Sequence, residues 1–276
     1  MPLYDQHVHS CHSFDSAAAP AANVERAIAR GLAGLTFAEH LDTHPDDWKT
    51  CIYDDEAYSA TIKRLRSDFG DAIFIGKGIE VCYQPDRMDF ILDFLERHEF
   101  DMVMLSVHYF GPRAVHNRQN WTDVDAVEGT RRYLESVLEA ARLCERLHET
   151  RGRVFDVLGH LDVVKRYTTR FFDANEVLRF GDLLDRILET CIAADVVPEI
   201  NTSTVRKDRI EPMPGADTIA RYVRLGGTAM SLGSDAHLPE SVGADFDRAV
   251  AVLHAAGLHH AAIFKKRERF TEKVSG

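Results

Sequence analysis

Residues 4–16 read YDQHVHSCHSFDS, a strand-like stretch and turn that contain Asp5, His7, His9, His12 and Asp15. A core strand normally carries apolar residues at the positions that imidazoles occupy here. The stretch is therefore either a solvated N-terminal edge or the first part of a metal site. His7 and His9 are two residues apart, so on a strand both side chains point to the same side and can bind one cation.

Seven apolar runs with strand character alternate with amphipathic runs along the chain. The strand-like runs are residues 2–8, 34–38, 72–79, 101–106, 154–158, 196–200 and 228–232. Apolar residues at three- and four-residue spacing predict helices at residues 23–30, 56–69, 87–97, 123–149, 174–194 and 216–225. The alternation predicts right-handed βαβ units, and seven repeats favour a closed or nearly closed α/β barrel. Residues 261–270, AAIFKKRERF, are expected to add a last short strand or to seal the lower end of the barrel.

Each predicted strand is followed by a residue type that binds metals. In chain order these residues are His7 and His9, Glu39 and His40, Glu80, His108, His160, Glu199 and Asn201, and Asp235 and His237. In a barrel of parallel strands these positions share the C-terminal face, where the active sites of such barrels lie. Seven separate pieces of sequence are therefore expected to converge on one pocket.

The candidate ligands are imidazoles and carboxylates, with no thiolate among them. This combination suits zinc, manganese, iron or cobalt, whereas an all-oxygen set suits magnesium or calcium. The candidates exceed the three protein ligands of a typical catalytic zinc, so we expect two or three divalent metal ions with bridging carboxylates. Clustered metals of this kind favour phosphoester hydrolysis. The candidates for direct metal ligands are His7, His9, His40, Glu80, His108, His160, Asp235 and His237, with Asp15 nearby.

Each candidate also has a structural interpretation that needs no metal. Glu39 and His40 can lie near a helix N-cap, Asp235 can cap a turn, and Glu80 and His108 can be hydrogen-bonded core groups. The convergence at one face favours metal binding over these alternatives. His12 is out of register with His7 and His9 and is expected in a loop. The other histidines are expected on the surface: His44, His98, His116, His148, His254, His259 and His260.

The composition argues against binding to nucleic acid or to an anionic membrane. The 276 residues include 33 Lys and Arg against 44 Asp and Glu, a formal charge of -11, whereas such partners need a basic face. No apolar run approaches the roughly 20 residues that span a bilayer. We expect one domain over residues 1–276, because no linker or repeat interrupts the chain.

The N-terminus and the cysteines both favour the cytoplasm. The first ten residues, MPLYDQHVHS, lack the basic and apolar regions of a signal peptide. The five cysteines are scattered and form no CxxC pair, which predicts free thiols rather than disulfides or zinc thiolates. Free thiols are typical of a reducing cytoplasm.

Seven motifs in order resemble the PHP (polymerase and histidinol phosphatase) family. They are DQHVHS, EH after the second strand, GIE, SVH, GHLD, EINTS and SDAH, and their spacing resembles the stand-alone histidinol-phosphate phosphatase branch. The resemblance covers residues 3 to about 270. It implies a distorted (β/α)7 TIM-like barrel with three metals at its C-terminal face. It also implies cleavage of a phosphate monoester, L-histidinol phosphate, in histidine biosynthesis.

The resemblance also implies which residues hold each metal. One metal would bind His7, His9, Glu80 and Asp235, and a second Glu80, His108 and His160, with Glu80 bridging the two. A third would bind His40 and His237, and either Asp15 or Glu39 would complete it. Some family members have histidine where this chain has Asp15.

The same resemblance implies a mechanism and substrate contacts. A hydroxide that bridges the first two metals would attack the phosphorus, with Glu80 between the metals and either Asp235 or His237 as proton donor to the leaving alkoxide. The phosphatase branch often reads NTSGLRK where this chain reads NTSTVRK, so that Ser203 and Arg206 are kept. Arg206 is expected to hold the substrate through its fork of N–H donors, the alternative being a structural arginine. Lys165 or Arg166 would supply a second positive contact.

Two other functions are compatible with such a site. A nucleotide phosphoesterase or 5′–3′ exonuclease of the same family would share the metals, but it should also have a basic groove. A non-catalytic barrel that stores metal or binds a partner is the second alternative. Such a degenerate copy should have lost ligands, whereas this sequence retains a complete set.

Overall fold

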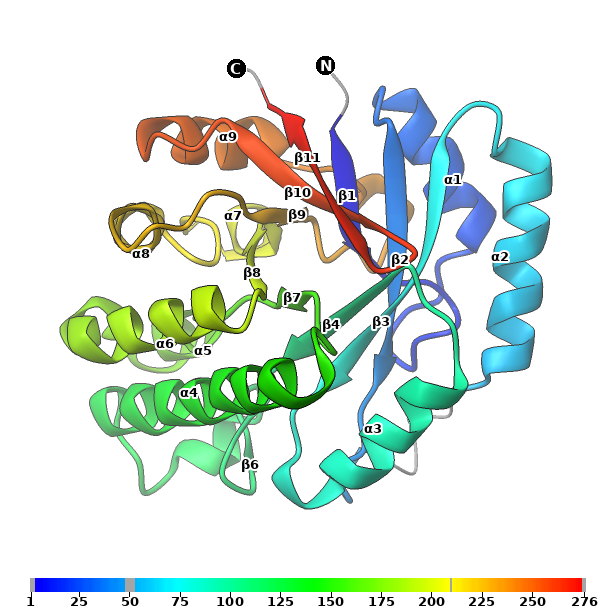
Figure 1. Cartoon of the computed structure of the whole chain (residues 1–276). Helices are drawn as coiled ribbons and strands as arrows, with labels where there is room; N and C mark the ends of the chain where they lie inside the picture. The colour runs from blue at the N-terminus through cyan, green and yellow to red at the C-terminus, as the bar shows by residue number, and fades with distance from the viewer. Residues whose placement is uncertain (1–2, 48–52, 209, 275–276) are drawn as a thin grey trace.

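The computed structural model describes residues 3–47, 53–208 and 210–274. Its centre is a seven-stranded parallel sheet in the order β1-β2-β3-β4-β7-β8-β9, curved into a nearly closed barrel (Figure 1). The strands are β1 (Tyr4–Val8), β2 (Gly34–Leu41), β3 (Phe74–Cys82), β4 (Met102–Ser106), β7 (Val157–Leu158), β8 (Val197–Asn201) and β9 (Ser231–Gly233). All seven predicted strands are present, which confirms the distorted TIM-like α/β barrel.

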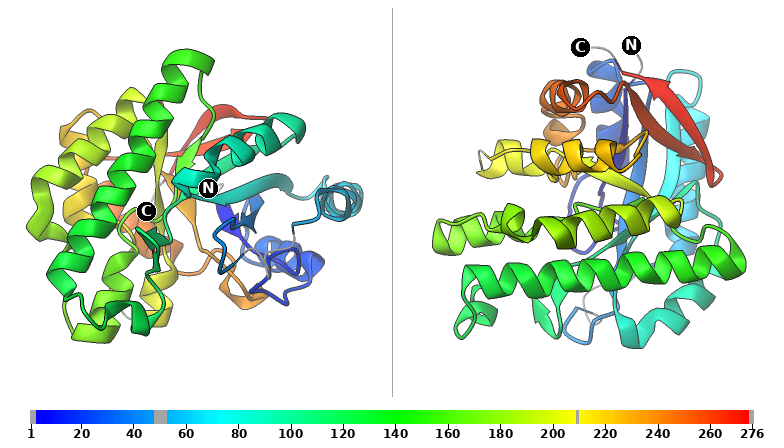
Figure 2. Two further views of the ribbon diagram at one scale, coloured as in Figure 1. Left: turned by 90° about the horizontal axis from the view of Figure 1, so that it is seen from below. Right: turned by 60° about the vertical axis from the view of Figure 1, so that its left-hand side comes forward.

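Helices cover the outside of the barrel, with α1 to α3 on one side and α4, α6, α8 and α9 stacked on the other (Figures 1 and 2). The helices are α1 (Pro20–Ala29), α2 (Asp55–Phe69), α3 (Met88–Arg97), α4 (Ala126–Arg151), α5 (Val164–Phe172), α6 (Gly181–Ala193), α7 (Ser203–Asp208), α8 (Ala216–Arg224) and α9 (Phe246–Ala255). A small hairpin of β5 (Tyr109–Phe110) and β6 (Arg113–Ala114) follows β4.

The six predicted helices form, with shifted ends, and three more were not predicted: α5, α7 and α9. The predicted helix 123–149 begins at Ala126, because Asp125 caps it by accepting a hydrogen bond from the Glu128 N–H at 2.8 Å. The predicted helix 174–194 begins only at Gly181, after a 3-10 turn over Val177–Phe180.

Two strands extend further than their sequences predicted. β2 and β3 remain paired through His40↔Glu80 and Leu41↔Val81. Glu39, His40 and Glu80 therefore lie within strands and not after them. The polar residues did not end these strands, because the backbone hydrogen bonds between parallel neighbours continue past the last apolar position.

The barrel is closed differently at its two ends. At the C-terminal end of the strands, β1 meets the loop after β9, where the His9 N–H donates to the Ala236 carbonyl at 2.8 Å. At the N-terminal end of the strands, called here the lower end of the barrel and drawn at the top of Figure 1, lies a hairpin of β10 (His260–Lys265) and β11 (Glu268–Lys273). The Gln6 side chain acts like a peptide group there, donating to the Ala262 carbonyl at 2.6 Å and accepting from the Phe264 N–H at 2.8 Å. The tail thus seals the lower end, as the sequence predicted.

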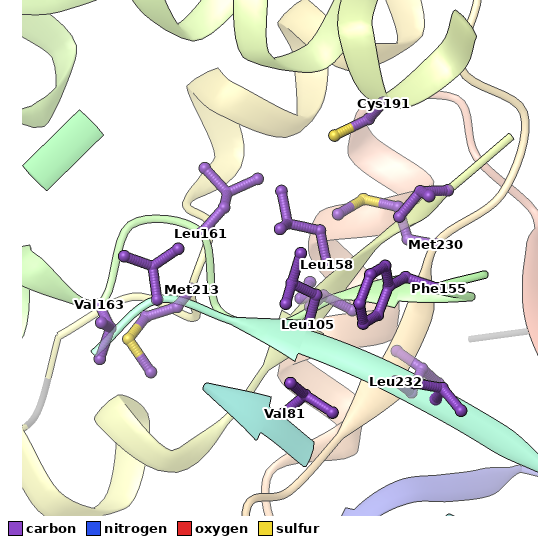
Figure 3. Packing of buried hydrophobic residues seen from close by; sticks show 14 of the residues in the cluster. Val81, Leu105, Phe155, Leu158, Leu161, Val163, Cys191, Met213, Met230 and Leu232 are labelled. Atoms are coloured by element: carbon purple, nitrogen blue, oxygen red, sulfur yellow. The ribbon is translucent and has the colours of Figure 1, made fainter. Parts of the chain in front are cut away.

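The register of the strands determines which side chains face the interior. His40, Glu80 and Met104 are direct neighbours across the sheet, so all three point to the same side. The lower interior is filled by a separate apolar cluster: Ala38, Met102, Met104, Val157, Val197, Ala229, Ala262 and Phe264. A larger cluster packs the outer faces of the strands against the helices, and Figure 3 shows part of it around Leu105 and Leu158.

Two further expectations concern cysteines and membranes. Cys11, Cys82, Cys144 and Cys191 are free thiols, as predicted, and Cys51 lies outside the described residues. Within the described part of the chain, no helix combines the length and apolar character needed to cross a bilayer.

Candidate metal centre

Separate segments bring the predicted ligands to the C-terminal end of the barrel. β1, β2 and β3 supply His7, His40 and Glu80, and His9 follows β1 directly. The loops after β4, β7 and β9 supply His108, His160, Asp235 and His237. A cavity of about 470 Å³ opens there and is lined by six of these residues: His40, Glu80, His108, His160, Asp235 and His237. Two larger cavities, of about 600 and 700 Å³, lie beside the outer helices, and none of the predicted site residues lines them in the described structure.

The first group consists of His7, His9, Glu80 and Asp235. The Nε2 atoms of His7 and His9 lie 3.0 Å apart. Glu80 Oε2 lies 3.4 Å from Nε2 of His7 and 3.6 Å from Nε2 of His9. Asp235 Oδ1 lies 3.9 and 3.6 Å from the same two nitrogens. Ligands bound at about 2.0–2.1 Å to one tetrahedral ion lie about 3.3 Å apart. His7, His9 and Asp235 are close enough together to hold a single metal ion, and Glu80 lies against both of these imidazoles.

The second group shares Glu80 with the first. Glu80 Oε1 lies 3.1 Å from His160 Nε2 and 3.5 Å from His108 Nε2. The other carboxylate oxygen, Oε2, faces His7 and His9. The two oxygens of one carboxylate therefore face two different groups of imidazoles, which is the arrangement of a bridging ligand.

The third group contains Asp15 rather than Glu39. Asp15 Oδ2 lies 2.9 Å from His237 Nε2 and 3.5 Å from His40 Nε2. Glu39 is buried, accepts hydrogen bonds from the hydroxyls of Ser10 and Ser13, and does not line the cavity. The expectation of Glu39 as a ligand is therefore wrong in this structure, because adjacent residues on β2 point to opposite faces and His40 takes the inner one.

The comparisons with known proteins agree with this architecture. Residues 5–203, more than half of the chain, match the model of the PHP domain. This chain belongs to the PHP family. Asp235 and His237 lie beyond the matched residues, so the PHP site of this chain also draws on the segment that follows them.

Two relatives of this PHP protein cover nearly its whole length. Histidinol-phosphatase from Lactococcus lactis subsp. lactis (strain IL1403) is 29% identical over 268 residues, which span 96% of this chain and 95% of the relative. The crystal structure of histidinol phosphate phosphatase from the same strain, complexed with zinc, L-histidinol and phosphate, has a TM-score of 0.85 at 27% identity over 97% of this chain and 98% of that one. A solved structure from Listeria monocytogenes, at 18% identity and a TM-score of 0.75, covers 88% of this chain and 98% of its own and shares the fold.

The pKa values of two ligand residues in the PHP site are shifted toward the protonation states that bind cations. Burial raises the pKa of the Glu80 carboxyl, but the imidazoles of His7 and His40 outweigh burial and hold the pKa well below its usual range. Burial and the neighbouring imidazoles of His237 and His40 hold the pKa of His9 well below its ordinary value. The carboxylate is therefore charged and the His9 imidazole neutral at neutral pH, as metal ligands must be.

The surroundings of His40 also favour a bound cation, although its pKa is shifted upward and not downward. Burial lowers the pKa of His40, but Asp42 and Glu80 raise it to about 9. The position thus attracts a proton at neutral pH, and a divalent metal ion competes for the same lone pair. The donor set, which holds nitrogen and oxygen atoms without sulfur, fits zinc, manganese, iron or cobalt.

Of the predicted substrate contacts, Arg166 lines the cavity of the PHP site and Ser203 does not. The Arg166 side chain donates to Asp208 Oδ2 at 3.1 Å and contacts the Ser203 hydroxyl. Ser203 is fully buried, and its Oγ lies 2.6 Å from Asn201 Oδ1 and 3.1 Å from Asp235 Oδ2. Ser203 therefore links Arg166 to Asp235 and is not placed against substrate, contrary to the prediction.

Lys165 does not reach the cavity, so its prediction as a substrate contact is wrong. Its ammonium lies 2.8 Å from Asp162 Oδ2 and donates to the Pro212 carbonyl at 2.7 Å. The side chain is fully buried. It ties the turn after His160 to the loop that precedes α8.

Arg206 has the structural role that the sequence left open, since Nη2 donates to the carbonyls of Ser234 and Asp235 at 2.5 and 3.3 Å. It does not line the cavity. Its Nε and Nη1 are nevertheless buried without a hydrogen-bond partner among the described residues.

Among the cavity-lining residues that the sequence analysis did not assign to the site are two charged ones, Lys207 and Asp42. Lys207 follows Arg206 directly in the NTSTVRK motif, and the basic pair was the available signal. Asp42 stands two residues after His40, so a continued strand would have put both on one side. Its oxygens lie 3.8 Å from the Nδ1 atoms of both His40 and His108.

The predicted locations of three histidines outside the set of ligands are confirmed for two and wrong for the third. His12 lies in a turn, with Nε2 3.1 Å from Thr61 Oγ1, as expected. His44 is buried and stacks on Tyr109 with ring centroids 4.0 Å apart, so the prediction of a surface residue is wrong. His116 is exposed but lines the cavity.

Proposed function

We propose that this protein is a metal-dependent phosphomonoester hydrolase that converts L-histidinol phosphate and water to L-histidinol and phosphate. The observation that carries the proposal is the single carboxylate of Glu80 between two groups of imidazoles, within a chain that resembles the Lactococcus lactis enzyme over 96% of its length. A phosphate monoester needs concentrated positive charge in its transition state, and a site that can hold neighbouring cations provides it.

The proposal assigns three metal positions. His7, His9 and Asp235, with Glu80 beside them, would hold the first ion, Glu80, His108 and His160 the second, and Asp15, His40 and His237 the third. When bound, divalent ions such as zinc would neutralise phosphate charge and acidify a water molecule. Glu80 would keep the first two positions at a fixed separation.

The residues of the chain itself would bind and orient the substrate. Arg166 and Lys207 both line the cavity and place positive charge where phosphate oxygens would lie. Asp42 and Asp47 also line the cavity and would favour the cationic amine of histidinol over an uncharged or anionic leaving group.

In the reaction, the bond between phosphorus and the alcohol oxygen breaks and the oxygen of water bonds to phosphorus. One proton of the water is released, and the departing alkoxide takes up a proton. Asp235 and His237 line the cavity and are the two candidates for the proton donor. His237 Nδ1 lies 3.4 Å from Asp235 Oδ1, which is beyond the reach of direct proton transfer.

The proposal treats residues 1–276 as one catalytic domain in the cytoplasm. Asp235 and His237 come from the last quarter of the chain, yet they complete a site that begins at His7. Residues that are far apart in the sequence are needed together, so a fragment that lacks either His7 or Asp235 would be inactive.

The test is phosphate release from L-histidinol phosphate, thymidine monophosphate and a short single-stranded oligonucleotide, with metal content measured on the same sample. We expect kcat/KM for histidinol phosphate to exceed that for the nucleotide at least 100-fold. His7→Ala and Glu80→Gln should lose bound metal and activity together. Faster turnover of the nucleotide or oligonucleotide would instead support a nucleotide phosphoesterase or exonuclease. No turnover of any phosphomonoester by the metal-loaded protein would support a non-catalytic barrel.

A further inference from the structure

We propose that Glu199, which does not line the cavity, is a positioning residue that sets the metal-binding geometry of two of the three metal positions. Glu199 is the third residue of β8 and is fully buried. Its two carboxylate oxygens contact His7 and His160, which belong to different groups of candidate ligands. The inference rests on the metal-binding part of the proposed function.

The contact with His7 determines which ring nitrogen faces the metal position. His7 Nδ1 lies 2.7 Å from Glu199 Oε1, a short distance at which the nitrogen must carry the proton and donate it to the carboxylate. In the neutral ring, Nε2 then keeps its lone pair. That lone pair faces the Nε2 of His9 at 3.0 Å, where a cation would lie between the two nitrogens.

The second oxygen of Glu199 holds the backbone of the second position. Oε2 accepts a hydrogen bond from the His160 N–H at 2.8 Å. The His160 side chain extends from this point to Glu80 Oε1, at 3.1 Å. One buried carboxylate therefore places a ligand of the first position through its side chain and a ligand of the second through its backbone.

The fold leaves room for this carboxylate at one glycine. A Cβ atom at Gly233, on the neighbouring strand β9, would lie 2.0 Å from Glu199 Oε1 and 2.6 Å from His7 Cβ. No side chain fits at that distance unless the carboxylate moves. The absence of a side chain at Gly233 therefore allows Glu199 to reach His7.

A polar chain extends from Glu199 to the remaining ligand of the first position. Asn201 Nδ2 donates to Glu199 Oε2 at 3.2 Å, and Asn201 Oδ1 accepts from the Ser203 N–H at 3.0 Å. Ser203 Oγ in turn lies 3.1 Å from Asp235 Oδ2. Displacing Glu199 is thus expected to disturb Asp235 as well as the two histidines.

The experiment measures zinc affinity, by competition with a chromophoric chelator, and bound zinc per chain. Glu199→Gln is the main variant, because an amide cannot accept from both His7 and His160, and its NH2 group opposes one of the two donors. We expect zinc affinity to fall about 10- to 100-fold. Gly233→Ala leaves Glu199 in the sequence but displaces its carboxylate, and it should lower zinc affinity in the same way.

Asp156→Asn is the matched control. Asp156 is also a fully buried carboxylate, and it binds Arg153 and the Val103 N–H beyond the lower end of the barrel. This variant should lower the melting temperature and leave zinc affinity within about threefold of the wild type. A merely structural role for Glu199 predicts that the two carboxylate variants behave alike.

Zinc affinity within threefold of the wild type in both Glu199→Gln and Gly233→Ala would overturn the inference. An equal loss of affinity in Asp156→Asn would also overturn it. The measurement needs no substrate. A protein whose zinc affinity depends on Glu199 but that does not hydrolyse histidinol phosphate would therefore contradict the proposed function and leave this inference standing.

Discussion

The carboxylate of Asp5 accepts two hydrogen bonds from Ser234, one from its backbone N–H at 2.9 Å and one from its hydroxyl at 2.5 Å. A third bond comes from the Gly243 N–H at 2.7 Å. This pair joins β1 to the loop that carries Asp235, whose φ of 51° lies in the left-handed region. The first strand therefore holds in place the ligand loop that lies furthest from it in the sequence.

Asp5→Ala should lower the free energy of unfolding by about 3–5 kcal/mol, because it leaves buried donors at Ser234 and Gly243 without an acceptor. Urea denaturation in the presence of EDTA measures this without a contribution from bound metal. Asp71→Ala, at an exposed position, is the control and should change stability by no more than about 0.5 kcal/mol. An effect of Asp5→Ala below 1 kcal/mol would contradict the assignment.

Asp15→Ala should remove about one bound metal ion per chain, whereas Glu39→Gln should keep the full number. Asp15 faces His40 and His237, but the carboxylate of Glu39 is occupied by Ser10 and Ser13. Elemental analysis of the dialysed proteins gives the count. The reverse pattern would transfer the third ligand position to Glu39.

Substitution of the adjacent residues Arg166 and Lys165 should affect different properties, substrate binding for the first and stability for the second. Arg166→Ala removes a cation from the cavity and should raise KM about 10- to 100-fold, since a charge-assisted hydrogen bond contributes about 1.5–3 kcal/mol. Lys165→Met leaves Asp162 buried without its partner and should lower stability by about 3–5 kcal/mol. The kcat/KM of its folded fraction should stay within threefold of the wild type. Steady-state kinetics and chemical denaturation of both variants measure the two effects. A large change of KM in Lys165→Met would contradict the assignment of Lys165 to a structural role.

Phe264→Ala should lower the free energy of unfolding by about 3–5 kcal/mol, as expected for a fully buried aromatic side chain. Phe264 fills the lower interior of the barrel from β10. Phe270, on the paired strand β11, is 44% exposed and provides the control. Its replacement by alanine should cost less than about 1 kcal/mol, and equal effects of the two variants would show that the hairpin does not seal the core.

The sequence was sufficient for the barrel and for most of the ligands. Parallel strands alternate with helices, and a polar residue at the C-terminal end of each strand has a defined place in such a fold. His7, His9, Glu80 and Asp235 could therefore be assigned to one site without any coordinates. Their grouping in space follows the assignment that the family resemblance implied.

Contacts made by side chains were not predictable in the same way. Lys165 and Arg166 are neighbours with the same charge, yet one ammonium is used inside the protein and one guanidinium faces the cavity. Glu39 and His40 are neighbours on β2, and their roles depend on a strand that extends three residues further than its apolar run. Such differences arise because consecutive residues point in different directions, and burial decides which of them finds a partner.

The order of elements, the barrel and the chemistry of the donor atoms follow from the amino-acid sequence, because hydrophobic periodicity and residue type are local properties. The folded structure was needed to show that Glu80 lies between two groups of imidazoles, that Asp15 rather than Glu39 faces His237, and that Glu199 lies behind His7. Those relationships join residues up to about 220 positions apart. They depend on strand register and on the packing of the closed barrel, which no local pattern contains.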